Sequence, residues 1–509
     1  MHRFVKLALI AAALCVPFVP AEAGKKDNTL VWATDRENSI TDSNYLNTRE
    51  LVIIGSLIYD RLIQLDDEYD PKPLLATAWT WVNDTTLDLD IRKGVKFHSG
   101  KELDADDVVY TISFLINRDH GALSYSYVSY IKSAEKLDSH KVRLHFEKPF
   151  PTALVFLAGV PNIMAKGHYD NAPARADGKK DFGAVPANGT GPYKVSEMKP
   201  GESILMTANA GYWEGSPKGK PQIANIKFRT IKDSNARLAE VMTGAVDWVW
   251  DVPKDQAERM QNAPNLTVEN AKTLRIAYIN FDAAGASPQK NFKDKRVRQA
   301  IAHAINREAI VKNIVGEPSE VIHAACHPDQ FACASDVPKY DYNPEKAKKL
   351  LAEAGFPNGF EFELHAYRER EHTEAIIGDL VKVGLKPKLV YLQYAPLMQA
   401  IHKGQVSATH MTWGSSSIPD VSACAAHFFK GTPDDMAKDP ELIRLISEAD
   451  GTVDPNKRKA LWKQALTRIA EEAYWVPLFT YAKYYVYSKE LDFKATSDEI
   501  PQFYRAKWK

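Results

Sequence analysis

The feature that most constrains this fold is a long chain without internal repeats. A single hydrophobic core stops growing at about 250–300 residues, and the sequence has 509. No repeated segment is present that could stack into a solenoid. We therefore expect two or more lobes, each with a core of its own.

The first 23 residues have the layout of a secretory signal. A basic stretch over residues 2–6 precedes an apolar run over 7–19, and residues 21–23 are Ala-Glu-Ala. The run is too short for a hydrocarbon core, which needs about 20 residues. Cys15 is no lipid-attachment site, because a leucine precedes it where a small residue is required. We predict cleavage near Ala23 and a periplasmic protein without membrane insertion.

The charge balance argues against partners that need a basic surface. The 65 Lys and Arg residues equal the 65 Asp and Glu residues. Nucleic acid and anionic lipid both demand a basic face, so neither is an expected partner. A hydrophobic fraction of 45% and a charged fraction of 26% are typical of a globular chain.

Three cysteines follow the predicted cleavage site. Thiols in an oxidising compartment pair where geometry allows. Cys326 and Cys333 flank a short segment, and we favour a disulfide that closes this loop. Zinc binding is the alternative because His323 and His327 are close by, although the spacing matches no standard zinc pattern. Cys424 is predicted to be a buried free thiol. No metal or cofactor is expected.

Local patterns indicate mixed α and β structure. Residues 87–97 alternate around a Lys-Gly turn, which predicts a β-hairpin. Asp104 is a plausible N-cap for a helix to residue 116. Residues 343–355 have an Asn cap, Pro at the first helical position and a Gly stop. Irregular stretches at 171–189 and 283–291 divide the chain into three segments of domain size.

Motifs of common enzyme classes are missing from the sequence. No Gly-x-Ser-x-Gly elbow, His-Glu-x-x-His site or Gly-rich phosphate loop ending in Gly-Lys-Ser/Thr is present. Residues 414–417, Gly-Ser-Ser-Ser, lack the second glycine of the elbow. Catalytic groups need not be neighbours in sequence. A secreted hydrolase and a chaperone-like periplasmic protein therefore remain alternatives to a solute-binding protein, and we expect no enzyme.

Short segments along the whole chain resemble one family, in the family's order. They include Tyr59-Asp-Arg-Leu, Leu89-Asp-Ile-Arg-Lys-Gly-Val-Lys-Phe-His-Ser-Gly100, Asp104-Ala-Asp-Asp-Val-Val-Tyr110, Gly189-Thr-Gly-Pro-Tyr193, Gly211-Tyr-Trp213, Gly244-Ala-Val-Asp247, Arg296-Val-Arg-Gln-Ala-Ile-Ala-His-Ala-Ile-Asn-Arg307 and Asn343-Pro-Glu-Lys-Ala-Lys-Lys-Leu-Leu-Ala-Glu-Ala-Gly355. The chain thus resembles the peptide/nickel class of extracellular solute-binding proteins of ABC importers.

The resemblance implies an α/β fold, a type II-like, two-lobed periplasmic-binding-protein clamp with an extra subdomain on its first lobe. Lobes of this kind close around a ligand by a hinge motion. The first lobe would comprise 24–60, 189–275 and 480–509, the extra subdomain 61–188, and the second lobe 276–479. The implied function is capture of a peptide or peptide-like solute by a monomer, which delivers it to an inner-membrane permease with separate ATPase subunits.

The resemblance also implies ligand-binding residues in the second lobe. Dipeptide binders of the family place an arginine after a strand that corresponds to residues 362–367. Arg368 or Arg370 matches it, and a solvated charge run is the alternative. Trp413 falls on the family's tryptophan, so an aromatic wall for the ligand and a core tryptophan are the two interpretations. The aromatic stretch 474–487 is assigned to packing.

The serine loop after this tryptophan departs from the family pattern. Peptide binders have an aspartate there to hold the ligand's ammonium, whereas this sequence has Ser415, Ser416 and Ser417. Serine can hydrogen-bond an ammonium but cannot neutralise it. Asp420 is the only acid in the loop and sits at the family's Pro-Asp pair. We predict that Arg368, Arg370, Trp413, the three serines and Asp420 form the ligand site.

Ordinary peptides with free N-termini are therefore in doubt as ligands. A modified peptide, an opine, a sugar-acid conjugate or a metal chelate remain open. An acid from the first lobe is the alternative source of the missing charge, and Asp35, Glu37 and Asp42 lie just beyond the first strand. Each of these is also explained as a surface acid.

Overall fold

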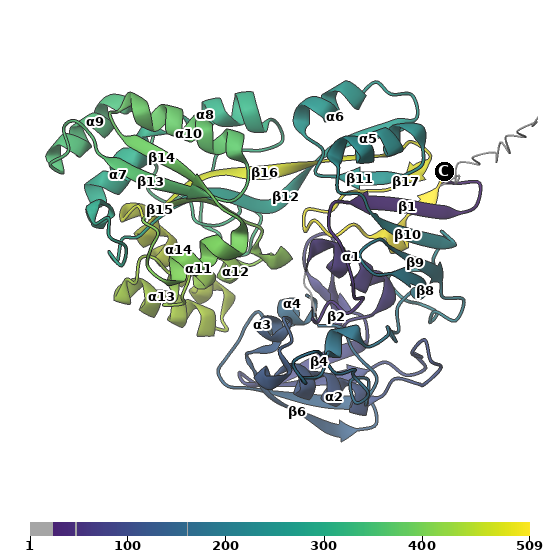
Figure 1. Cartoon of the computed structure of the whole chain (residues 1–509). Helices are drawn as coiled ribbons and strands as arrows, with labels where there is room; N and C mark the ends of the chain where they lie inside the picture. Colours follow the sequence, from purple (N-terminus) through teal and green to yellow (C-terminus); the bar gives the residue numbers. More distant parts are fainter. Residues whose placement is uncertain (1–23, 46–47, 160) are drawn as a thin grey trace, which may run out of the picture.

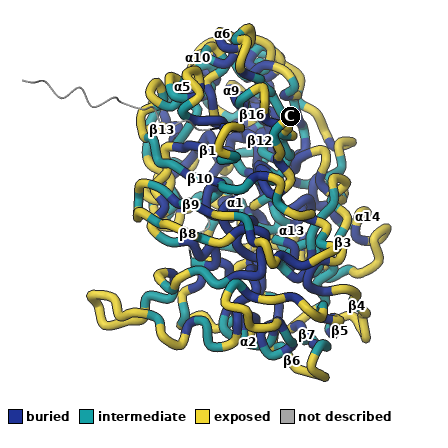
Figure 2. The backbone as a smooth tube through the Cα atoms, turned by 90° about the vertical axis from the view of Figure 1, so that its right-hand side faces the viewer, coloured by how far each residue is buried: buried dark blue, intermediate teal, exposed yellow. Residues whose placement is uncertain are grey.

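The computed structural model of the chain describes residues 24–45, 48–159 and 161–509. The predicted signal peptide, residues 1–23, lies outside the described residues. Figure 1 shows two lobes side by side, with a third body below the lobe that contains the N-terminal strand. Buried residues run through the interior of each part, and exposed residues gather in outer loops and turns (Figure 2). The expected two-lobed α/β fold is confirmed.

One ten-stranded sheet runs through both lobes. Its two central strands are β12 (Leu266–Phe281) and β16 (Trp475–Ser488), which pair antiparallel and pass from one lobe into the other (Figure 1). The pairing register shifts between Lys272 and Ile276. These two long strands form the covalent link between the lobes. No other strand in the described part of the chain passes from one lobe into the other. The predicted borders at 275/276 and 479/480 fall inside them.

The first lobe builds its part of the sheet beside β16. The strand order there is β16, β11 (Trp248–Trp250), β1 (Thr29–Thr34), β10 (Asn225–Thr230), β9 (Ser203–Ala208) and β8 (Tyr193–Lys199). Its helices are α1 (Arg49–Ile58), α5 (Ser234–Thr243) and α6 (Lys254–Met260). Trp32, Trp248 and Phe503 are fully buried and contact one another, so segments from both ends of the chain share this core.

The third body is a four-stranded antiparallel sheet with a helix against it. Its order is β4 (Ala76–Asn83), β5 (Thr86–Ile91), β7 (Lys141–Phe146) and β6 (Ile131–Asp138). Its helices are α2 (Ala105–Leu115), α3 (Tyr125–Val128) and α4 (Ala153–Leu157). The short strands β2 (Ile63–Leu65) and β3 (Pro71–Pro73) connect it to the first lobe. The predicted cap is confirmed, because the Asp104 side chain accepts from the Asp107 N–H at 3.3 Å.

The predicted hairpin over 87–97 is wrong. Strand β5 pairs with β4 and β7, whereas the backbone of Val95 accepts a hydrogen bond from Leu103 N–H at 2.8 Å. Val95 and Phe97 are buried, as their alternation indicated. Alternation reports which side chains face a core, but it does not say which segment is the backbone partner.

The second lobe places β15 (Ala408–Trp413), β13 (Glu361–Ala366) and β14 (Lys386–Tyr391) on the other side of β12. Asn343 caps the predicted helix and Gly355 has a φ of 91°, so both expected end signals are confirmed. The helices of this lobe are α7 (Lys295–Ala304), α8 (Arg307–Ile310), α9 (Pro344–Glu353), α10 (Arg370–Lys382), α11 (Tyr394–His402), α12 (Ser422–Phe429), α13 (Pro440–Gly451) and α14 (Pro455–Glu471). The C-terminal strands are β17 (Leu491–Asp492) and β18 (Lys507–Trp508).

The structure contains the predicted disulfide between Cys326 and Cys333, and Cys424 is a buried free thiol. The disulfide loop packs on the segment that follows Trp413, because the Gln330 amide donates to the carbonyls of Ile418 and Asp420 at 3.0 and 3.1 Å. In the described part of the chain, no helix combines the length and apolar character needed to cross a bilayer.

Candidate ligand-binding site

A cavity of about 560 Å³ lies between the lobes. This volume falls within the roughly 300–1,000 Å³ of small-molecule sites. Each part of the fold contributes to its lining: Arg49 from the first lobe, Tyr127 from the third body, Trp413 from the second lobe and Glu499 from the C-terminal segment. A ligand in this cavity would contact both lobes at once.

Arg368 lines the cavity just beyond the carboxyl end of β13. Its Nε donates to the Glu369 carboxylate at 3.1 Å. Its two terminal nitrogens have no hydrogen bond or ion pair with the residues described here, and 34% of the side chain is exposed. Burial disfavours the charged guanidinium, but Glu369, Tyr367, Asp251 and Tyr481 together outweigh it and raise the pKa of Arg368. Arg368 is thus a permanent cation with free donors in the cavity.

Trp413 also lines the cavity, at the end of β15. Its indole N–H donates to the Ala423 carbonyl at 2.8 Å, and its ring stacks on His427 with centroids 4.6 Å apart. The side chain is half-buried. The ring is therefore fixed in one orientation, as a wall for a ligand requires.

The three serines after Trp413 form a tight turn in which all three residues are left-handed, with φ of 49°, 50° and 63°. Ser416 and Ser417 line the cavity, whereas Ser415 is buried and does not. The Ser417 hydroxyl donates to the Asp498 carbonyl at 2.6 Å and accepts from Arg49. This hydroxyl thus bridges the lobes, and its proton is already donated within the protein.

Two other predicted residues lie outside the cavity lining. Asp420 is buried inside the second lobe, where both carboxylate oxygens accept from Arg458 at 2.7 Å. Arg370 starts α10, its side chain is 64% exposed, and its Nε pairs with Glu374 at 2.8 Å. Arg368 and Arg370 differ because the chain turns from a strand into a helix between them.

The alternative acids of the first lobe do not reach the cavity either. Asp42 is fully buried, and the Tyr169 hydroxyl donates to it at 2.7 Å. Burial raises the pKa of Asp42 to about 6. Glu37 pairs with Lys232 on the surface at 2.5 Å, and Asp35 is exposed. None of the three is among the residues described as lining the cavity.

Like Glu50 on α1, Asp251 is an acid of the first lobe that lines the cavity, and it directly follows β11. About half of its side chain is exposed, and its carboxylate lies 3.0 Å from Lys483 Nζ. Burial opposes ionisation, but the charges of Lys483 and Arg368 lower the pKa of Asp251. Its second oxygen is available to a ligand donor. Sequence patterns gave no signal for it, since it follows a three-residue strand.

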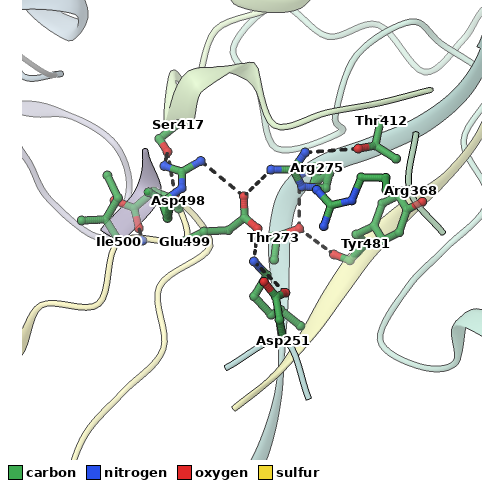
Figure 3. A network of polar contacts seen from close by, with 12 residues as sticks. Asp251, Thr273, Arg275, Arg368, Thr412, Ser417, Tyr481, Asp498, Glu499 and Ile500 are labelled. Carbon is green, nitrogen blue, oxygen red and sulfur yellow. Dashed lines mark hydrogen bonds and ion pairs between the residues drawn. The ribbon is translucent and has the colours of Figure 1, made fainter. Parts of the chain in front are cut away.

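A network of charged groups around Glu499 was not anticipated either (Figure 3). The Glu499 carboxylate is 2% exposed and lies 3.4 Å from Arg49, 3.1 Å from Arg275 and 2.9 Å from Lys483. Burial opposes ionisation, yet the charges of Arg275 and Lys483 lower the pKa of Glu499 well below its usual range. Glu499 belongs to an irregular segment with no periodic pattern, so local sequence rules cannot single it out.

Cations outnumber acids in the cavity lining. The basic residues are Arg36, Arg49, Arg61, Lys218, Arg275, Arg368 and Lys483, and the acids are Glu50, Asp251, Asp498 and Glu499. Asp60 neutralises Lys218 at 2.8 Å. Burial raises the pKa of Glu50 and of Asp498, which weakens their negative charge. The surplus of positive charge favours an anionic group in the ligand.

A cavity between two α/β lobes that share one sheet is typical of a periplasmic-type solute-binding protein. The chain matches the family described as bacterial extracellular solute-binding proteins, family 5 Middle, over residues 70–435, and it belongs to this family. Its function is that of the substrate-binding component of an importer.

Three relatives show how far the similarity extends. The oligopeptide-binding protein AppA of Bacillus subtilis is 28% identical over 88% of this chain and 86% of its own. The glutathione-binding protein GsiB of Salmonella choleraesuis is 26% identical over 95% of this chain and 94% of its own. The solved structure of HbpA2 from Haemophilus parasuis is 25% identical, covers 94% of this chain and 100% of its own, and has a TM-score of 0.80.

Proposed function

We propose that this protein captures a small anionic peptide or peptide-derived solute for an ABC importer, and that Arg368 binds the carboxylate of that solute. The observation that carries the proposal is the pair of unengaged terminal nitrogens on Arg368 in the cavity. A guanidinium fork matches a carboxylate with two parallel hydrogen bonds, which are stronger than neutral ones. Trp413, which lines the same cavity, offers an apolar face for another part of the solute.

The proposal includes the route of the protein and its cargo. The predicted signal directs export, cleavage near Ala23 releases a monomer into the periplasm, and the closed protein delivers its solute to an inner-membrane permease. No catalytic step is involved. The Ser417 hydroxyl, which lines the cavity, accepts a hydrogen bond from Arg49 and donates one to the Asp498 carbonyl. Neither group is a general base of the kind that activates a serine nucleophile.

The charge of the cavity favours a solute with a net negative charge over a zwitterion. The serine turn supplies no acid, and one oxygen of the Asp251 carboxylate is already paired with Lys483. A free ammonium would therefore meet a surplus of cations. Two relatives are named for oligopeptide and glutathione binding, which supports a peptide-like solute. An opine or a sugar-acid conjugate with one carboxylate offers the same chemistry.

The test is calorimetric titration with three forms of alanyl-phenylalanine: the free dipeptide, its N-acetyl form and the N-acetyl C-terminal amide. We expect the N-acetyl acid to bind at least tenfold tighter than either of the others. Arg368→Gln should weaken binding of the acid at least thirtyfold, because a charge-assisted fork is lost. Arg370→Gln is the matched control, two residues away and exposed, and should change affinity less than twofold.

Two results would overturn the proposal. One is an N-acetyl amide that binds as tightly as the acid. The other is an Arg368→Gln protein that is folded and keeps its affinity. Native mass spectrometry of protein taken from its own periplasm complements the titrations, because a closed clamp retains cargo whose mass identifies it.

A further inference from the structure

Three cations converge on one point of the cavity from distant parts of the chain. Arg49 lies on α1, Arg275 on β12 and Lys483 on β16. All three line the cavity, and each is within 3.4 Å of a Glu499 carboxylate oxygen. Like charges this close repel, and the repulsion grows as water is excluded. The three groups therefore define an anion site, which Glu499 fills.

Glu499 reaches this site from a segment that has no helix or strand. Its φ is 58°, a left-handed conformation that is unfavourable for glutamate. Backbone contacts on both sides hold it there: Leu274 N–H donates to the Ser497 carbonyl at 2.8 Å, and Ile500 N–H donates to the Asp498 carboxylate at 2.9 Å. An unfavourable backbone conformation persists only where surrounding contacts fix it, so the carboxylate is held firmly in place.

The second lobe can accommodate the Glu499 carboxylate because Gly414, which lies next to it, has no side chain. A Cβ on Gly414 would lie 3.0 Å from Arg275 Nη2 and 3.3 Å from Glu499 Oε2. Gly414 directly follows Trp413, the proposed aromatic wall of the ligand site. The anion site thus adjoins the ligand site, and Figure 3 shows Arg275 between Glu499 and Arg368.

We propose that Glu499 determines specificity by occupying a second carboxylate site inside the ligand cavity. The Glu499 side chain supplies the carboxylate that Arg49, Arg275 and Lys483 would otherwise bind from a ligand. Arg368, Arg36 and Arg61 remain in the lining as cationic partners for an acid group, whereas a ligand carboxylate placed beside Arg275 would meet the negative charge of Glu499. This inference rests on the proposed function and narrows its ligand to one that places no second carboxylate beside Arg49, Arg275 and Lys483.

The first experiment asks whether the site binds a carboxylate when Glu499 is removed. Glu499→Gly opens the site and suits the left-handed backbone. Acetate should bind this variant at least tenfold tighter than the wild type in calorimetric titration, and should raise its melting temperature where sodium chloride at the same concentration does not. Glu490→Gln is the control, because Glu490 pairs with Lys25 on the surface. Equal acetate affinity in folded Glu499→Gly and wild type would overturn the proposal.

The second experiment uses Glu499→Gln, which keeps the size of the side chain and loses its charge. The probes are N-acetyl-alanyl-glutamate, with two carboxylates, and N-acetyl-alanyl-glutamine, with one. The affinity ratio of the first to the second should rise at least tenfold in the variant. A merely structural role would weaken both probes together and leave the ratio unchanged, and an unchanged ratio refutes the inference.

These experiments separate this inference from the function on which it rests. Acetate binding to Glu499→Gly needs no knowledge of the natural solute. If acetate binds but the wild type does not distinguish an N-acetyl dipeptide from its amide, the proposed function fails and the anion site stands. If the wild type makes that distinction but neither Glu499 variant behaves as expected, only the specificity role of Glu499 fails.

Discussion

Two irregular segments meet in the cavity, residues 413–420 of the second lobe and residues 496–500 near the C-terminus. Both contain left-handed residues other than glycine. They touch where the Ser417 hydroxyl donates to the Asp498 carbonyl at 2.6 Å. Each holds one buried acid, yet the two acids are held in different ways.

Asp420 is paired by one arginine of its own lobe, Arg458, with both oxygens engaged. Glu499 is shared by cations from the first lobe and from both strands that link the lobes. The first arrangement completes the interior of one lobe. The second places a carboxylate where a ligand can compete for its partners. Asp420 and Glu499 are both buried, so burial does not distinguish their roles. The roles differ because the cations that pair with them come from different parts of the fold.

The largest expected effect comes from Asp420. Asp420→Asn leaves Arg458 buried and unpaired, and breaking such a pair costs about 3–5 kcal/mol of unfolding free energy. Guanidinium denaturation measures this loss, while affinity of the folded protein for an N-acetyl dipeptide should not change. The double variant with Arg458→Gln is the control and should lose less than the sum of the single variants. If the variant keeps its stability but loses affinity for the dipeptide, Asp420 is a ligand-binding residue and this interpretation is wrong.

A smaller effect is expected from the disulfide that supports the second-lobe segment. Its cysteines are seven residues apart, and closing so short a loop contributes about 2–3 kcal/mol by the chain-entropy relation. Replacing both cysteines by serine should therefore lower the denaturation midpoint, and reducing the wild type should lower it by the same amount. Elemental analysis tests the alternative. If the wild type contains stoichiometric zinc and the variant has lost it, the two cysteines form a metal site and not a disulfide.

The smallest effects separate the serines of the turn from one another. Ser417→Ala removes a hydroxyl that joins the two segments and should cost about 1 kcal/mol, the net value of a hydrogen bond. Ser416→Gly relieves a φ of 50° at an exposed side chain and should be neutral or stabilising by up to about 1 kcal/mol. In thermal melts, the melting temperature should fall for Ser417→Ala and should stay unchanged or rise for Ser416→Gly. Equal losses would show that the turn depends on all of its side chains.

The sequence predicted those features that local patterns encode. The cap at Asp104 and the helix ends at Asn343 and Gly355 are set by side chains and turns within a few residues. The disulfide pairing followed from two cysteines close in sequence. The resemblance of whole segments pointed to Trp413 and to Arg368 or Arg370, and of these Trp413 and Arg368 line the cavity.

What only the tertiary structure decided is which charges face one another. Glu499 is 450 residues from Arg49 and 224 from Arg275, so no spacing rule connects them. The choice between Arg368 and Arg370 likewise depended on where a strand ends and a helix begins. Electrostatic energy depends on distance in space and on exclusion of water, and both are fixed only when β12 and β16 bring the lobes together around the cavity.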